Sequence, residues 1–405
     1  EATARGLKRF IPQDFDRAVT RLCNFFSTLG EEVKALVGQL GFHRAQDLVG
    51  LSSLLTQVDC LDTVDMSELL EPVTVPRVRT VQAVDRALRR PRNHLTMLVS
   101  QLIMNSVEQG ERTIVFEADR VNAADRALGT HLAGEIIRYQ RRFVRKGRQN
   151  GHSDDEIDNT NGHPFPGATL RFYASSIAGN GLGAFNTDGV QILVEGGAQD
   201  GMGKGACGGK VVVLKGMNHH GELIDGSVGK SFAYGAQGGL FIVQGDADSR
   251  ACIRLSGAYV LIGGEVREPL SDHLGFIGTR ANVKGFLCEY MTDGTVVILG
   301  DPGPWICAGM TGGTLYVRLQ PDMGLDRAAI RRRIAKGSNV ALRDPTQKDE
   351  KPLTFLLSAY RDELVASNQS AEARRIERLL TEWTQHFVKI EPASSLQVDQ
   401  TVSTE

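Results

Sequence analysis

The segment GMGKGACGGKVVVLKG, residues 201–216, decides how the second half of this chain is interpreted. Its crowded glycines and nearby lysine look like a phosphate-binding loop, but such a loop stands between a strand and a helix. Here the glycines lead into a β-branched apolar stretch, which is typical of a strand. The segment therefore indicates a glycine turn followed by a strand, and nucleotide binding is not expected.

The same unit recurs along residues 168–324. Short β-branched stretches begin at residues 169, 190, 210, 240, 258, 295 and 314, and turns such as ACGG at 206–209 and MTGG at 310–313 precede them. Comparable apolar positions lie about 20 residues apart, at spacings of 21 for Val190–Val211, 18 for Phe241–Tyr259 and 19 for Val296–Leu315. Short strands at this period predict a parallel β-helix of stacked coils.

Glycine is expected at the coil corners because a tight turn needs a positive φ and leaves no room for a Cβ. A β-branched residue in place of Gly208 is therefore expected to disrupt its coil. The glycines assigned to corners are Gly183, Gly189, Gly208, Gly209, Gly238, Gly239, Gly257, Gly294, Gly312 and Gly313.

Helices are predicted on both sides of the coils, which makes the fold class α+β. Apolar residues recur at three- and four-residue steps over 14–40, which predicts one helix, capped by Asp14, with a buried stripe. Further helices are predicted at 43–50, 66–70, 95–109, 123–144 and 371–388. The predicted division is 1–80 (helical), 81–146 (helices and a strand entering the coils), 147–167 (loop), 168–324 (coils), 325–390 (C-terminal helical cap) and 391–405 (disordered tail).

Composition excludes several classes of partner. The chain has 405 residues, of which 46 are basic and 48 acidic, so no global field favours nucleic acid or an anionic membrane. No apolar run approaches the roughly 18 residues that span a bilayer, and no secretion signal is evident, so a cytoplasmic location is expected. The six cysteines are scattered and are expected to be free thiols.

Two polar clusters resemble ligand sites. His219 and His220, with Asp225 nearby, offer metal ligands, but neighbouring residues at a strand end point in opposite directions, and a turn is the simpler interpretation. The acidic turn GDADSRA, with Asp246, Asp248 and Arg250, superficially fits a polysaccharide lyase, although aspartate is common in turns. No catalytic, cofactor or metal residue is assigned.

The cysteines of the repeat region are better explained by packing than by a cluster. Buried cysteine behaves as a small apolar residue, and two of them lie one period apart. Interior filling is therefore predicted for Cys207, Cys252, Cys288 and Cys307.

Several segments resemble one known family. The stretches VNAADRALGTHLAGEI (121–136), NGLGAFNTDGVQILVEGGAQDGMGKGACGGKVVV (180–213), CEYMTDGTVVILG (288–300) and AGMTGGTLYV (309–317) resemble the C-terminal glycine-repeat domain of the glutamate synthase large subunit. NFFSTLGEEVKALVGQLGFHRAQDLVG (24–50) is similar to the segment that follows the flavin barrel, and WTQHFVKIEP (383–392) to the end of many such subunits. The likeness runs from about residue 15 to 392.

The resemblance implies a right-handed β-helix that braces a glutamine amidotransferase and a flavin barrel and flanks an ammonia tunnel. This sequence shows no leading cysteine, no span of roughly 250 residues for the barrel and no close trio of cysteines for an iron–sulfur cluster. We therefore expect a non-catalytic structural subunit of a glutamate synthase-like hetero-oligomer, of which the N-methylglutamate synthases are one multi-subunit example. Its partners would be flavin-barrel and amidotransferase-like chains that carry FMN and the iron–sulfur cluster, and this chain would bind no cofactor.

The alternative is a scaffold subunit of another redox complex, such as a formylmethanofuran dehydrogenase-like assembly. For either role, the candidate partner or tunnel surface is Asn180, Phe185, Lys204 and Gly205, where glycines permit close approach. The insertion at 266–287 departs from the family pattern and is either a solvated loop or a partner-specific surface.

Overall fold

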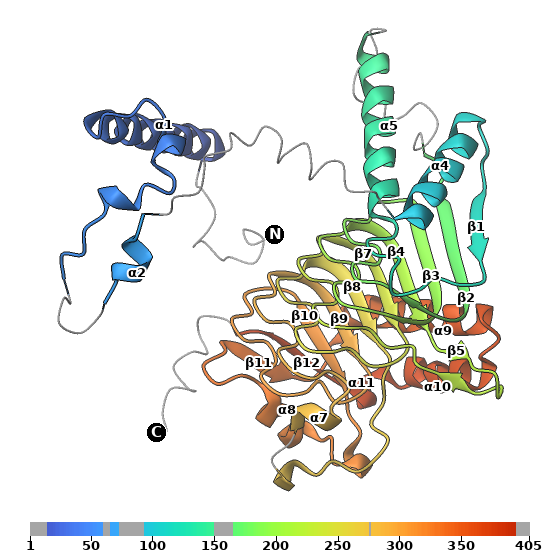
Figure 1. Ribbon diagram of the computed structural model, residues 1–405. Coiled ribbons are helices and arrows are strands. Elements are labelled where there is room, and N and C mark those ends of the chain that lie inside the picture. The colour runs from blue at the N-terminus through green and yellow to red at the C-terminus, as the bar shows by residue number, and fades with distance from the viewer. Residues whose placement is uncertain (1–13, 60–64, 73–92, 150–164, 275–276, 394–405) are drawn as a thin grey trace. The chain divides into compact units, whose positions relative to one another are not determined.

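The computed structural model of the chain describes residues 14–59, 65–72, 93–149, 165–274 and 277–393 (Figure 1). It divides into two compact units, Glu1–Arg90 and Pro91–Glu405. The six-part division stays a prediction. Most of the loop at 147–167 and residues 394–405 of the predicted tail lie outside the described residues.

The first unit contains one long helix. Its elements are α1 (Phe15–Gln39), the 3₁₀ helices η1 (Ala45–Leu48) and η2 (Ser52–Leu54), and α2 (Ser67–Leu70). Asp14 caps α1 as predicted, because its side chain accepts a hydrogen bond from the Arg17 backbone N–H. The prediction of a buried stripe is wrong: in α1 only Val37 is buried. A helix cannot cover its own apolar face, and the described residues of this unit supply no second surface.

The second unit is built on a large, mostly parallel sheet of ten strands. Its order is β1-β2-β3-β4-β7-β8-β9-β10-β12-β11, and only the pairs made by β12 are antiparallel. The strands are β1 (Ile114–Ala118), β2 (Ala168–Ala178), β3 (Val190–Ala198), β4 (Cys207–Leu214), β7 (Gly238–Val243), β8 (Ser256–Ile262), β9 (Asp293–Ile298), β10 (Thr314–Arg318), β11 (Val340–Arg343) and β12 (Phe387–Pro392). A separate hairpin pairs β5 (Gly216–Met217) with β6 (Leu223–Ile224).

The register of the parallel strands gives a sharper period than the sequence did. Three neighbouring pairs align residues 19 apart, namely Ile192–Val211, Phe241–Val260 and Val296–Leu315. Val211 aligns with Ile192 and not with Val190, and Phe241 aligns with Val260 and not with Tyr259, so two of the three predicted alignments are off, by two residues and by one. Strands buried on both faces read as continuous apolar runs, which leaves the sequence without an alternation to fix the register.

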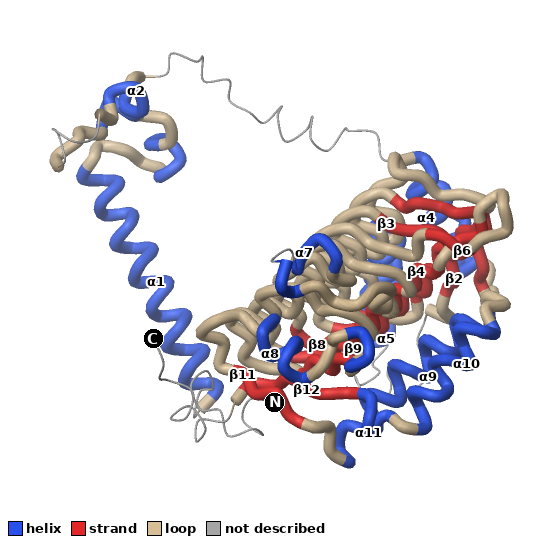
Figure 2. Tube along the Cα trace, turned by 90° about the horizontal axis from the view of Figure 1, so that it is seen from below, coloured by secondary structure: helices blue, strands red, loops and turns tan. Residues whose placement is uncertain are grey.

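The two faces of the sheet pack against different partners. Val211, Phe241 and Val260 belong to the core on one face of the sheet. The residues that follow them, such as Val212 and Ile242, pack in a second core with residues of α9 (Glu350–Ala366) and α10 (Ser370–Thr381). Figure 2 shows α9 and α10 side by side next to the strands. Each strand is therefore held from both sides.

The remaining helices correct two predictions. They are α4 (His94–Glu108), α5 (Thr130–Gln149), α7 (Ile277–Arg280), α8 (Arg327–Arg333) and α11 (Trp383–His386). The helix predicted at 123–144 begins only at Thr130, because Ala127 and Gly129 adopt positive φ angles of 53° and 90°. None of the described helices has the length and apolarity needed to cross a membrane.

The helix predicted at 371–388 is also shorter than expected. It is interrupted after Thr381, and Phe387 begins β12, where Val388 pairs with Val317 of β10. Pairing with an open strand edge outweighs the helical periodicity of this segment. The predicted C-terminal helical cap therefore also contains two strands, β11 and β12.

A buried carboxylate ties the cap to the sheet. Asp349 accepts hydrogen bonds from the Tyr316 hydroxyl of β10 at 2.7 Å and from Lys389 Nζ of β12 at 3.1 Å. Burial opposes ionisation of Asp349, but these bonds and those from Thr346 outweigh it and lower the pKa of the carboxyl. The start of α9 is thereby fixed to two strands.

The glycines before the strands lie where neighbouring coils approach closely. Gly189, Gly209, Gly239, Gly257, Gly294 and Gly313 have positive φ. Gly208, Gly238 and Gly312 do not, so the predicted reason for Gly208 is wrong. A Cβ there would instead overlap the side chain and backbone of Asp188.

We expect Gly209→Ala to unfold the chain far more readily than Gly235→Ala. Both glycines have positive φ, but a Cβ on Gly209 would lie 2.5 Å from the Thr187 carbonyl oxygen, whereas one on Gly235 meets nothing within 4 Å. Backbone strain alone should lower the free energy of unfolding by about 1 kcal/mol in Gly235→Ala. Strain together with the overlap should lower it by at least about 3 kcal/mol in Gly209→Ala. Urea unfolding of both variants measures the difference, and equal losses would contradict it.

Candidate functional site

The connections that lead into β3, β4, β7, β8, β9 and β10 contain residues with positive φ. We call each such connection a corner, and the corner together with its strand a coil; the corners form one edge of the stacked coils. In six successive coils, three alternate residues have φ between 53° and 80°. These corners are 181–185, 201–205, 231–235, 250–254, 286–290 and 305–309. Glycine occupies many of these positions in the first coils, but bulky residues take them later.

In the first five corners, hydrogen bonds run alternately to the two neighbouring coils, and among the described residues the corner 305–309 shows only the bond to the preceding coil, from Cys307 N to Leu287 O. Arg250 N donates to Gly285 O at 2.8 Å, Cys252 N to Phe232 O at 2.7 Å, and Arg254 N to Glu289 O at 2.7 Å. The outer two bonds reach the following coil and the middle one reaches the preceding coil. These hydrogen bonds stabilise a left-handed backbone conformation that would otherwise be unfavourable.

The middle position of each corner faces the interior. A Cβ on Gly203 would lie 2.6 Å from the Phe241 ring, so only small residues fit this column. Cys252, Cys288 and Cys307 occupy it and are fully buried, which raises the pKa of the Cys288 and Cys307 thiols. Their predicted role as interior filling is confirmed, whereas Cys207 is exposed and the prediction is wrong there. Buried thiols of raised pKa are poor nucleophiles.

The outer positions carry exposed aromatic rings and cations. Phe185 is 58% exposed, Tyr290 51% and Trp305 54%. The rings of Phe286 and Trp305 stack with centroids 5.0 Å apart. We call the outer residues of this edge the corner ridge, comprising Phe185, Lys204, Tyr234, Arg250, Arg254, Phe286, Tyr290 and Trp305.

Each cation of the corner ridge lies over a ring. Lys204 is 5.3 Å from the centroid of Tyr234, and the guanidinium of Arg254 is 5.9 Å from that of Tyr290. Arg250 is 5.7 Å from the ring of Phe286. Cation–π contacts of this kind hold the charges outward on aromatic supports.

The four residues predicted as a partner surface lie at this edge. Phe185 N donates to Lys204 O at 2.8 Å, and the Phe185 ring covers Gly205. Asn180 is exposed and its carbonyl accepts from Ala127 N at 2.8 Å. Their role as a partner or tunnel surface stays a prediction. The corners at 250–254 and 286–290, which contain no glycine at the positive-φ positions, and the corner at 305–309, which has only Gly309, were missed because glycine was the signal followed.

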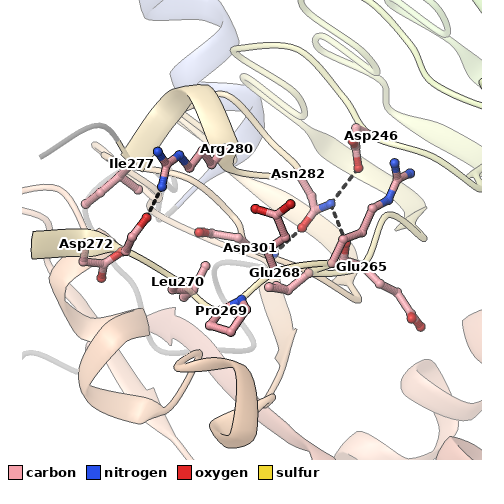
Figure 3. A pocket seen from close by; sticks show the side chains of 13 residues that line it. Asp246, Glu265, Glu268, Pro269, Leu270, Asp272, Ile277, Arg280, Asn282 and Asp301 are labelled. Atoms are coloured by element: carbon pink, nitrogen blue, oxygen red, sulfur yellow. Dashed lines mark hydrogen bonds between the residues drawn. The ribbon is translucent and has the colours of Figure 1, made fainter. Parts of the chain in front are cut away.

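The insertion lines a pocket near the coils (Figure 3). The pocket has a volume of about 430 Å³ and lies between residues 265–272, the start of α7 and the coil residues Asp246, Asn282 and Asp301. The final part of the insertion belongs to the stack itself, since Val283 bridges to Ala247 and 286–290 forms a corner.

Most of the carboxylates that line this pocket have a partner within the chain. Asn282 Nδ2 donates to Asp246 Oδ1 at 2.7 Å, and Asn282 Oδ1 accepts from the backbone N–H of Asp301 at 2.8 Å, as drawn in Figure 3. Glu265 is paired with Arg318 and Arg375. The pocket therefore offers mainly neutralised carboxylates.

Arg333 binds two of the carboxylates that line the pocket and is itself fully buried. Its guanidinium binds both carboxylate oxygens of Asp301, at 2.5 and 2.7 Å, and both of Asp272, each at 2.9 Å. The hydrogen bond from Arg333 lowers the pKa of Asp272. One side chain thus joins α8, the insertion and a coil.

The two other candidate clusters are not assembled. The His219 and His220 rings lie 3.8 Å apart in the β5–β6 hairpin, and no three histidine, cysteine or acidic side chains among the described residues are placed to hold a metal. Asp248 pairs with Lys284, and Asp246 with Asn282, so the acidic turn is divided between different partners.

We expect Arg333→Met to destabilise the chain by about 3–5 kcal/mol, because two carboxylates would lose their buried partner. Arg332→Met is the matched control: Arg332 also contacts Asp272, at 3.0 Å, but is 56% exposed, and its loss should cost under about 1 kcal/mol. Urea unfolding at neutral pH measures the stability of both variants. Equal losses of stability would contradict the importance of the buried contact of Arg333 with Asp272 and Asp301.

The same pair predicts a pH dependence. A lowered folded-state pKa means that Asp272 stabilises the fold above its ordinary value of 3.8 and that this contribution is lost as the pH falls below it. The wild-type chain should therefore lose more stability than Arg333→Met between about pH 5 and about pH 3. If the free energy of unfolding falls equally with pH in the two proteins, Arg333 is not the cause of the lowered pKa of Asp272.

Comparison with known proteins identifies the family. The family model described as GXGXG motif matches residues 96–275 and 277–393. Ferredoxin-dependent glutamate synthase 2 of Arabidopsis thaliana is 31% identical over 77% of this chain and 17% of its own length. The glutamate synthase [NADPH] large chain of Bacillus subtilis is 26% identical over 93% of this chain and 22% of its own length.

Glutamate synthase [NADH] of Schizosaccharomyces pombe is 27% identical over 93% of this chain and 16% of its own length. The chain thus spans about a fifth of the length of the curated relatives it matches. The six corners found above carry the alternating glycine positions for which the matched motif is named. This chain therefore belongs to the GXGXG motif family and is similar to the C-terminal region of glutamate synthase large subunits.

Proposed function

We propose that this chain is a non-catalytic structural subunit of a glutamate synthase-like oxidoreductase in the cytoplasm. Other subunits of the hetero-oligomer, resembling a glutamine amidotransferase and a flavin barrel, carry the reacting groups, FMN and an iron–sulfur cluster. This chain braces them and flanks the path of ammonia between their sites. Its relatives are named glutamate synthases, which supports the reaction class.

The proposal rests mainly on the stack of coils, which is held both by side-chain packing and by hydrogen bonds between coils. Its strands are packed on both faces, and five of its six corners are hydrogen-bonded to both neighbouring coils. Such a body deforms little, and a rigid body is what two separated active sites need if ammonia is to pass between them without meeting water. The neutralised carboxylates of the pocket also favour a structural role over a catalytic one.

We further propose that the stack is a right-handed parallel β-helix with helical ends. The parallel strands form one wall, and isolated bridges form another, with Val228 joined to Ala198 and Ala247, and Ala247 joined to Val283. Two in-register walls connected by repeated corners are the geometry of stacked coils.

The proposal is tested by purifying the tagged chain from its native cells under mild conditions, with mass spectrometry and a visible spectrum of the intact assembly. We expect co-purification with a flavin-barrel chain and an amidotransferase-like chain, with flavin and iron–sulfur absorbance. The separately expressed chain, as control, should be colourless. The assembly should form glutamate from glutamine and 2-oxoglutarate with a supplied reductant.

Two results would overturn this function. A colourless assembly of this chain alone would remove the partners on which the proposal depends. Co-purification with unrelated redox chains, such as those of a formylmethanofuran dehydrogenase-like complex, would establish the alternative scaffold role instead.

A further inference from the structure

We infer that the corner ridge is the surface on which this chain binds a partner subunit of the proposed assembly, and that the partner's contacting surface is acidic and apolar. This inference rests on the proposed function for the partner's identity. It is argued from the backbone strain, the exposed rings and the charges of the ridge itself.

Backbone strain is the first argument. Gly181 and Gly201 occupy the first corner position in their coils, but Arg250, Phe286 and Trp305 occupy it in later coils with φ between 57° and 63°. An L-residue at such φ costs roughly 1–2 kcal/mol that glycine avoids. Glycine at the equivalent positions of the first coils shows that the corner forms without a side chain, so these bulky side chains are not needed to build it.

Exposure is the second argument. Phe185, Tyr290 and Trp305 are each more than half exposed, so most of their apolar surface contributes nothing to the core. Trp, Tyr and Arg are the residue types that dominate binding energy at protein interfaces. Adjacent coils lie about 4.8 Å apart, so six corners extend over roughly 24 Å, a length suited to one side of an ordinary protein–protein interface.

Charge is the third argument, and it determines the chemistry of the partner. Lys204 and Arg254 form no ion pair within the described part of the chain. Arg250 faces Glu289 at 3.7 Å, but the Glu289 side chain is only 12% exposed. The outward charge of the ridge is therefore positive over aromatic surface, which is complementary to carboxylates set among apolar side chains.

The test combines two substitutions that relax the backbone while removing the surface. Arg254→Gly with Trp305→Gly restores glycine at left-handed positions, so the variant should fold with an unchanged or higher Tm. Its affinity for the flavin-carrying subcomplex, purified from cells that lack this chain, should fall at least about 30-fold. Phe355→Ala is the matched control, because Phe355 is 48% exposed on α9, away from the corners, and should retain full affinity.

Contact is located by placing the photo-crosslinking residue p-benzoylphenylalanine at Phe185 in the native assembly. We expect cross-links to a segment of a partner subunit that contains aspartate or glutamate. Raising the salt concentration should also weaken the association of the wild-type chain with that subcomplex.

The possible failures are distinguishable. A complete complex formed with undiminished affinity by the double glycine variant would overturn the ridge inference and leave the proposed function standing. Cross-linking to a second copy of this chain, or ridge-dependent binding to a single-stranded oligonucleotide in place of protein, would overturn it as well. Absence of any flavin-carrying partner would overturn both proposals.

Discussion

The structure depends on hydrogen bonds that run from five of the six corners alternately to the coil before and the coil after them. Cys252 N reaches back to Phe232 O, whereas Arg250 N and Arg254 N reach forward to the coil that contains Glu289. Neither neighbour can slide without breaking one set. This constraint allows a left-handed backbone without glycine, which an isolated turn would not sustain. The strand register and the side-chain columns follow from it.

Much of the sheet was predictable from the sequence because β-branched stretches and glycine turns repeat. The period near 20 and the strand positions were found, but register was not, since neither Val211 nor Val212 is polar and both are buried. The local pattern also predicted a helix at Phe387, because this residue fits the apolar face of a helix. In the structure it begins β12, which pairs with β10. Long-range pairing is information that a local window does not contain.

The candidate sites show a related limit. Asn180, Phe185, Lys204 and Gly205 were selected because glycine permits close approach, and all lie at the corner edge. The later corners use arginine, cysteine and aromatic residues at the same φ, so their equivalence to glycine is visible only once the coils are aligned. The Arg333 clamp was equally hidden, because Asp272, Asp301 and Arg333 are distant in sequence and carry no shared motif.

The two polar regions of the stack differ in a way that bears on their roles. In the pocket, most carboxylates have partners within the chain, and Arg333 pairs with two of them, so a ligand would have to displace existing interactions. On the corner ridge, the cations rest on rings, so a carboxylate from another molecule would replace water rather than an ion pair of this chain. Binding at the ridge therefore breaks fewer interactions within the chain than binding in the pocket.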